Sequence, residues 1–313
     1  MKIDIFAHIL PKRYLETYSQ KNKAVLQTIE AKNRAIVDLD MRLRHMCRYP
    51  DVLHVLTIAQ PALESLVSPT EAVELARIAN DELAEIVDSY PDKFIGAVAC
   101  LPMSDIDAAL EEADRAITEL GFKGVQIYTT INGVMLDDPK IKPLYEKMAN
   151  YDLPIWIHPC TNERLGDLGG GILAWPFETA SAMMRLVSSG IFLEHPDIKF
   201  ITHHCGSMIP YFEKRIKWLM AERLGIGHPI RKPEEHFRKF YNDTAVYGNT
   251  AALMCGYAFF GADHILFGTD APLGPKFGLT IETIASIERM CIPDKEKEQI
   301  FLQNAINLLK IAV

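Results

Sequence analysis

The sequence lacks several features that mark whole classes of protein. It has no cluster of lysine and arginine with interleaved aromatic side chains, and its formal net charge is −8. This argues against a nucleic acid or an anionic membrane as the main partner. The most apolar long run, 251–262, is broken by glycine and shorter than the about 20 apolar residues that a membrane-spanning helix needs. We therefore expect a soluble enzyme that acts on a small molecule.

Paired cysteines and recognisable linkers are also missing. The six cysteines include no C-x-x-C pair, and no secretory leader precedes the first expected strand, which favours the reducing cytoplasm. No internal repeat, low-complexity stretch or linker divides the chain. We expect residues 1–313 to form one domain, because barrel folds of this size often do not split.

The sequence does contain eight apolar, strand-like runs that alternate with helix-like stretches, a pattern typical of a (β/α)₈ TIM barrel. These runs are 3–8, 52–59, 94–100, 124–127, 153–158, 198–204, 240–244 and 265–270. Helical spacing within 11–51 predicts a helical insertion after the first strand, and 281–309 predicts closing helices. A doubly wound open sheet is the alternative, but no G-x-G-x-x-G turn follows the first strand.

Polar side chains stand at the ends of several expected strands. They are His8, His158, His204 and Asp270. Because the carboxyl ends of barrel strands meet at one mouth, we expect these groups to converge. Two imidazoles and a carboxylate suit a divalent cation such as Zn²⁺, and open coordination positions are typical of catalytic sites. The pattern predicts a metal-assisted active site.

Several short motifs together resemble one family. In order they are Asp4-Ile5-Phe6-Ala7-His8, 123–127, 136–139, Ile157-His158-Pro159, His204 with Gly206 and Pro210, and 266–270. The chain is similar in these motifs to the amidohydrolase-related (amidohydrolase 2) enzymes, in particular the aminocarboxymuconate-semialdehyde and γ-resorcylate-type decarboxylases. The resemblance covers nearly the whole chain.

This resemblance implies a chemistry and a set of roles. A divalent metal, zinc first and manganese second, would be held by His8, His158 and Asp270. His204 would be the acid/base residue, with Asp270 or His204 as the proton donor. The substrate would be a small aromatic or unsaturated carboxylic acid that loses CO₂. The resemblance also implies a homodimer or a larger homo-oligomer.

One residue departs from the family pattern. The family usually has a histidine or glutamate two positions before His8, whereas this chain has Phe6, which cannot ligate a metal. Metal occupancy is therefore an open question. Phe6 is expected either to fill the core or to contact the substrate at the barrel mouth.

Three further expectations concern the residues around the site. Arg164 and Trp175, on the loop after the fifth strand, are expected to contact the substrate, with a solvated arginine and a helix staple as the alternatives. His203 should face away from His204 and be structural, because residues alternate along a strand. Cys160 and Cys205 are expected to be small buried side chains rather than ligands.

Two other functions remain open at this stage. Activated water could attack a lactone, amide or double bond, which would make the protein a metal-dependent hydrolase or hydratase of the same superfamily. Alternatively, Phe6 could mark a chain that binds ligands without turning them over.

Overall fold

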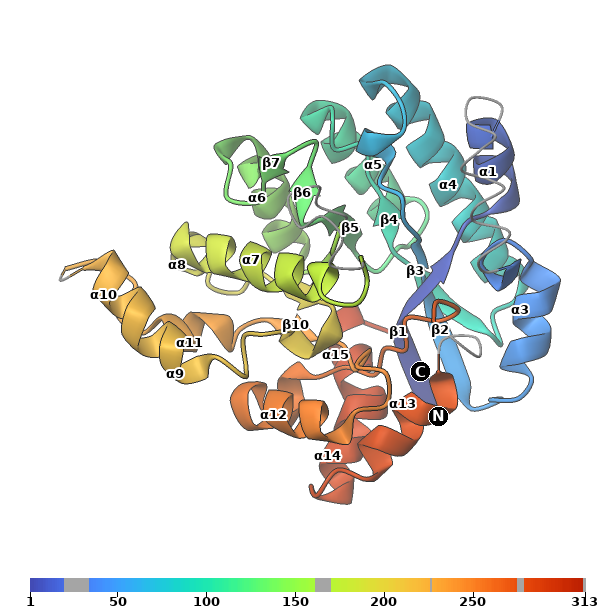
Figure 1. The fold of residues 1–313 in the computed structure, drawn as a ribbon. Coiled ribbons are helices and arrows are strands. Elements are labelled where there is room, and N and C mark those ends of the chain that lie inside the picture. The colour runs from blue at the N-terminus through green and yellow to red at the C-terminus, as the bar shows by residue number, and fades with distance from the viewer. Residues whose placement is uncertain (20–33, 161–169, 226, 275–278, 312–313) are drawn as a thin grey trace.

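A computed structural model describes the chain except for residues 20–33, 161–169, 226, 275–278 and 312–313. Parallel strands surround a central core and helices surround the strands (Figure 1). The strands are β1 (Lys2–Ile9), β2 (Val52–Ile58), β3 (Phe94–Ala97), β4 (Ala99–Cys100), β5 (Val125–Tyr128), β8 (Ile155–His158), β9 (Phe200–Thr202) and β10 (Tyr241–Asn242). A short hairpin of β6 (Thr130–Ile131) and β7 (Val134–Met135) follows β5.

Two parallel sheets join into a closed barrel. Their orders are β1-β2-β3 and β10-β9-β8-β5-β4, and the Val98 amide between β3 and β4 donates to Leu56 O of β2 at 2.9 Å. On the other side, Leu266 N donates to Asn242 O at 2.8 Å and Ile5 N donates to Phe267 O at 3.0 Å. The segment 265–271 therefore takes the eighth position, as a hydrogen-bonded stretch with a single bridge to β10 rather than a regular strand. The predicted (β/α)₈ barrel is confirmed.

Helices follow most of the strands, as the alternating pattern predicts. They are α1 (Lys12–Ser19), α3 (Leu39–Met46), α4 (Pro69–Ser89), α5 (Ile106–Thr118), α6 (Lys142–Tyr151), α7 (Ala174–Ser188), α8 (Ile191–Glu194), α9 (Glu213–Arg215), α10 (Ala221–Leu224), α11 (Pro233–Phe237), α12 (Thr250–Phe260), α13 (Thr280–Glu288), α14 (Asp294–Glu298) and α15 (Asn304–Leu309). Figure 1 shows α9 and α10 extending away from the barrel. No described helix is long and apolar enough to span a bilayer.

Local chemistry explains where the long helix α4 begins. Pro69 occupies its first turn, where the missing amide hydrogen costs nothing. Ser68 N donates to Glu71 Oε2 at 3.0 Å, and Ser68 Oγ lies 2.8 Å from the same oxygen. These contacts form a capping box, which satisfies amide groups that the helix itself leaves free.

The interior of the barrel is filled by side chains from opposite strands. Ile3, Val55 and Trp156 belong to one buried cluster, which also includes Leu308 and Leu309 of α15. Trp156 of β8 reaches across to β1, where its indole Nε1 donates to Ile5 O at 3.0 Å. This packed cluster fills the barrel interior below the strand ends.

The insertion after β1 is helical where it is described, and it supports the barrel directly. Arg42 of α3 is buried and donates from Nη1 to the backbone oxygen of His8. Its Nη2 lies 3.3 Å from His54 Nδ1 on β2. The inserted helix therefore fixes the end of the first strand.

Candidate active site

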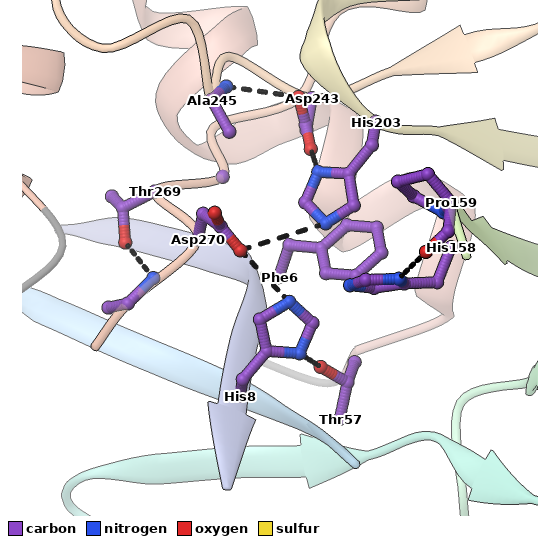
Figure 2. Close-up of polar contacts among 12 residues, drawn as sticks. Phe6, His8, Thr57, His158, Pro159, His203, Asp243, Ala245, Thr269 and Asp270 are labelled. Atoms are coloured by element: carbon purple, nitrogen blue, oxygen red, sulfur yellow. Dashed lines mark hydrogen bonds and ion pairs between the residues drawn. The ribbon is translucent and has the colours of Figure 1, made fainter. Parts of the chain in front are cut away.

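The strand ends bring four polar side chains to one point, as Figure 2 shows. His8 lies near the end of β1, His158 ends β8, His203 follows β9, and Asp270 follows the segment that closes the barrel. His8 Nε2 is 3.0 Å from Asp270 Oδ1, and the His8 and His158 ring centroids are 4.9 Å apart. His8 therefore lies next to both Asp270 and His158 at the barrel mouth.

Each of the three imidazoles is held at Nδ1 by a separate partner. His8 Nδ1 lies 2.8 Å from Thr57 Oγ1, His158 Nδ1 lies 2.6 Å from Pro159 O, and His203 Nδ1 contacts Asp243 Oδ2 (Figure 2). A carbonyl oxygen only accepts hydrogen bonds, so the proton of His158 is on Nδ1. The Nε2 lone pair of His158 is then free to bind a cation.

Burial keeps two of these histidines in the uncharged form that can ligate a metal. It lowers the pKa of His8, although Asp270 acts in the opposite direction. It lowers the pKa of His158 well below the usual value, and the nearby His8 and His203 lower it further. Both side chains are almost completely inaccessible to solvent.

His203 has the opposite electrostatics because it lies between two carboxylates. Its Nδ1 contacts Asp243, and its Nε2 is 3.9 Å from Asp270 Oδ1. Burial alone would lower the pKa of His203, but Asp243 and Asp270 outweigh burial and raise it. Burial would likewise raise the pKa of Asp270, yet the hydrogen bond from His8 and the nearby imidazoles hold it below its usual value. The carboxylates of Asp243 and Asp270 therefore favour a positive charge between them, either on a protonated His203 or on a bound cation.

The two consecutive histidines do not face opposite ways, so the expectation that His203 points away from His204 is wrong. Strand β9 ends at Thr202, before either of them, and His204 has a positive φ of 59°. Their rings stack with centroids 4.8 Å apart. His204 is half-buried, and burial together with His203 lowers its pKa to about 4. It lies beside the group of His8, His158 and His203 rather than within it.

Phe6 forms the inner wall of the site. Its ring is fully buried and stacks on His203, with centroids 3.6 Å apart and planes inclined by 26°. The centroid distances to His8 and His158 are 5.2 and 5.9 Å. Phe6 thus contacts the imidazoles from the barrel interior, as a core side chain would, and it also shapes the site.

Of the two expected substrate contacts, Trp175 can be placed. It lies in the first turn of α7, with its ring centroid 6.2 Å from that of His158. Its indole Nε1 is buried and has no hydrogen-bond partner among the described residues. Arg164 lies outside the described residues.

The two cysteines near the site have hydrogen-bonding or packing neighbours. Cys160 Sγ lies 3.0 Å from Thr130 Oγ1 and 3.3 Å from Thr129 Oγ1. Cys205 is buried and faces Gly256 of α12, where an added Cβ would lie 2.2 Å from Cys205 Sγ.

Three residues that support the site were not predicted from the sequence. Asp243, Thr57 and Tyr128 all lie at the ends of strands, and the Tyr128 ring centroid is 5.5 Å from that of His158. The usable signal was the position itself, because a polar or aromatic residue at the carboxyl end of a barrel strand faces the mouth. Asp243 lies next to the last residue of the seventh predicted strand, and Asp270 is the last residue of the eighth.

The residues present fit a divalent metal ion. His8, His158 and His203 each offer one ligand atom, and these atoms lie within 4.8 Å of one another. Outer partners at Nδ1 are typical of metal-binding histidines, and a carboxylate such as Asp270 suits both zinc and manganese. These donors can hold the ion without a ligand from position 6, where Phe6 has no donor atom.

Comparison with known proteins gives one family match over almost the whole chain. The family described as amidohydrolase matches residues 3–311. A γ-resorcylate decarboxylase from Polaromonas sp. is 33% identical over 307 residues, covering 90% of each chain. A 2-amino-3-carboxymuconate-6-semialdehyde decarboxylase from Dictyostelium discoideum is 28% identical and covers 99% of this chain and 91% of its own length.

A solved structure shows the same fold. The crystal structure of a dihydroxybenzoic acid decarboxylase from Polaromonas sp. has a TM-score of 0.83 and 29% identity, covering 99% of this chain and 96% of that one. It contains bound manganese and the inhibitor 2-nitroresorcinol. The resemblance drawn from the sequence motifs is confirmed by these matches.

Proposed function

Since this chain belongs to the amidohydrolase family, we propose that it is a divalent-metal-dependent decarboxylase of phenolic aromatic carboxylic acids. The observation that supports the proposal is the position of His8 at the barrel mouth, with its Nε2 3.0 Å from Asp270 Oδ1 and its ring centroid 4.9 Å from that of His158. The 33% identity to a γ-resorcylate decarboxylase makes a dihydroxybenzoate the first substrate to test.

The metal would be held by His8, His158 and Asp270. Zinc suits the imidazole donors, and manganese is the ion bound in the related crystal structure. When bound, such an ion would polarise the substrate's oxygens and neutralise part of their charge. The neutral forms of His8 and His158, which burial favours, suit this role.

His204 is proposed as the acid/base residue and Asp270 as its partner in proton transfer. A bound carboxylate would favour the protonated form of His204, because an opposite charge raises the pKa of a histidine. The proton passes to the ring carbon that bears the carboxylate. The bond from that carbon to CO₂ then breaks, its electron pair returns to the ring, and CO₂ leaves.

Trp175 is proposed to bind the substrate. Its buried indole N–H faces no acceptor among the described residues and can donate to a phenolate or carboxylate oxygen. Phe6 can contact the aromatic ring from the inner side. Arg164 is proposed to bind the substrate's carboxylate, as expected from the sequence.

The proposal is tested by measuring metal content and CO₂ release together. Protein purified without chelators should contain about one equivalent of zinc or manganese, and His158→Ala should lose it. The wild type should release CO₂ from 2,6-dihydroxybenzoate, and His204→Gln should keep the metal but lose this activity. Metal without CO₂ release from any phenolic acid, but with hydrolysis of a lactone or amide, would favour the hydrolase alternative. Ligand binding without turnover would favour the binding protein.

A homodimeric or larger assembly and a cytoplasmic location complete the proposal. The six cysteines are all free thiols, which suits a reducing compartment. Mass determination in solution and fractionation of the source cells would test the two points separately.

A further inference from the structure

Two buried polar side chains beside His158 have no role in the metal site. Tyr128 ends β5 and pairs in register with His158 of β8, and 5.5 Å separates the centroids of their two rings. Gln126 lies two residues earlier on β5, and both residues are buried. Because residues i and i+2 of a strand share a face, both side chains lie on the face of β5 that His158 continues on β8.

The hydrogen bonds of Gln126 fix the orientation of its amide group. Its Nε2 lies 2.9 Å from Ile58 O and 3.4 Å from the hydroxyl oxygen of Tyr128. A carbonyl oxygen only accepts hydrogen bonds, so the NH₂ group of Gln126, rather than its amide oxygen, faces Ile58. The same NH₂ group then donates to the Tyr128 oxygen, which leaves the Tyr128 proton for another acceptor.

This arrangement leaves one donor and one acceptor unused within the described part of the chain. No described residue accepts the Tyr128 proton, and the buried Gln126 Oε1 has no hydrogen-bond partner there. Burial raises the pKa of Tyr128 well above its usual value, so its hydroxyl group keeps the proton and remains a neutral donor. Because unpaired buried polar groups are costly, a ligand that pairs with both groups binds more tightly for it.

A ring hydroxyl is the substituent that matches both unused groups. Its oxygen can accept from Tyr128 while its own proton goes to Gln126 Oε1. A carboxylate or a phenolate only accepts and would be repelled by the amide oxygen, and a methyl group would leave both groups unpaired. Glu64, which is near enough to raise the pKa of Tyr128 further, also disfavours a second negative charge.

We propose that Tyr128 and Gln126 are specificity-determining residues, which bind a second, neutral hydroxyl group on the ring of the aromatic acid. This inference rests on the proposed decarboxylase function and narrows its substrates from phenolic acids in general to dihydroxybenzoates. The other oxygens of the substrate are left to the metal and to Trp175.

The test compares matched pairs of acids as substrates of the full-length, metal-loaded protein. One member of each pair is a 2-hydroxybenzoate with a second hydroxyl at one of the remaining ring positions, and the other carries a methyl group there. At one position, the wild type should prefer the hydroxyl compound by at least about 100-fold in kcat/KM for CO₂ release, because a site built for a hydroxyl rejects an analogue without one. Comparing one pair between variants cancels the intrinsic difference in reactivity.

Tyr128→Phe keeps the ring and removes only the hydroxyl, so it should reduce this preference by about 10-fold, through the hydroxyl compound alone. Gln126→Met, which is similar in volume, should reduce it by about the same factor. The matched control is Tyr145→Phe, which removes a buried hydroxyl that donates to Leu136 O at 2.7 Å and should leave the preference unchanged. Circular dichroism checks folding. If a variant turns over neither acid, calorimetric titration with the same pair measures the preference as a ratio of Kd values.

The outcomes separate this inference from the proposed function. A wild type that releases CO₂ from both members of every pair equally well would overturn the inference and leave the proposed function standing. Preferences that stay within about threefold of the wild type in both Tyr128→Phe and Gln126→Met would overturn it too, because a purely structural role affects both acids alike. No CO₂ release from any of these acids by the metal-loaded wild type would overturn both claims.

Discussion

At the scale of single residues, the buried indole N–H of Trp175 has no hydrogen-bond partner among the described residues. Trp175→Phe keeps the ring but removes the N–H group, so we expect weaker binding of dihydroxybenzoate or of a nitroresorcinol inhibitor. A hydrogen bond to a charged oxygen contributes about 1.5–3 kcal/mol, which corresponds to roughly 10- to 100-fold in affinity. Calorimetric titration measures it, and Trp218→Phe is the control because Trp218 is 68% exposed. Equal affinities of Trp175→Phe and the wild type would remove Trp175 from the site.

A second prediction at this scale concerns the contact of Gly256 with Cys205, the residue that follows His203 and His204. An added Cβ at Gly256 would lie 2.2 Å from Cys205 Sγ, so Gly256→Ala should overpack this contact. We expect a loss of about 1–3 kcal/mol in the free energy of unfolding, measured by urea denaturation. Cys205→Ala removes the sulfur and should restore part of that loss in the double variant. Additive losses in the double variant would show that the two side chains do not compete for space.

At the scale of elements, helix α3 is predicted to stabilise the end of β1. Arg42→Met would leave the backbone oxygen of His8 without its buried donor. An unsatisfied buried acceptor costs about 1–3 kcal/mol, so both the unfolding free energy and the zinc affinity should fall. Arg44→Met, on the same helix but exposed, is the matched control. Unchanged zinc binding in Arg42→Met would show that the inserted helix does not support the metal site.

The arrangement of elements also explains why one site can draw on so many parts of the chain. The strands β1, β8, β9 and β10 and the closing segment 265–271 each end at the same mouth. Asp4 strengthens this closure, because its Oδ1 accepts from Thr269 N at 3.1 Å and its Oδ2 contacts the Thr269 hydroxyl. The neighbouring Asp270 is thereby tied to the first strand.

At the scale of the whole molecule, metal binding should stabilise the fold. Ions that bind only the native state at 100 times their dissociation constant add about 2.7 kcal/mol, which for a chain of this size is roughly 5 °C in the unfolding midpoint. Zinc or manganese should therefore raise the midpoint of the wild type in a thermal scan. His158→Ala should not respond to the same ion. A similar rise in both proteins would place the stabilising ion elsewhere.

The sequence by itself determined the barrel and much of the mouth. Strand and helix periodicity is local, so the alternation along the chain predicted the eight positions, and His8, His158 and Asp270 could be placed at their ends. Even the eighth segment was located, although it forms only a bridge and backbone hydrogen bonds. The roles assigned to these three residues stay predictions until the metal is measured.

Only the tertiary structure decided which of the two adjacent histidines joins the cluster. Strand β9 ends at Thr202, and the turn that follows has positive φ at His204, Cys205 and Gly206. That turn depends on packing against α12, where Phe260 leaves no room for a Cβ at Gly206. Alternation along a strand therefore no longer applies beyond Thr202. Contacts between distant segments, such as His203 with Asp243 and Phe6, arise only when the barrel closes, and no local pattern encodes them.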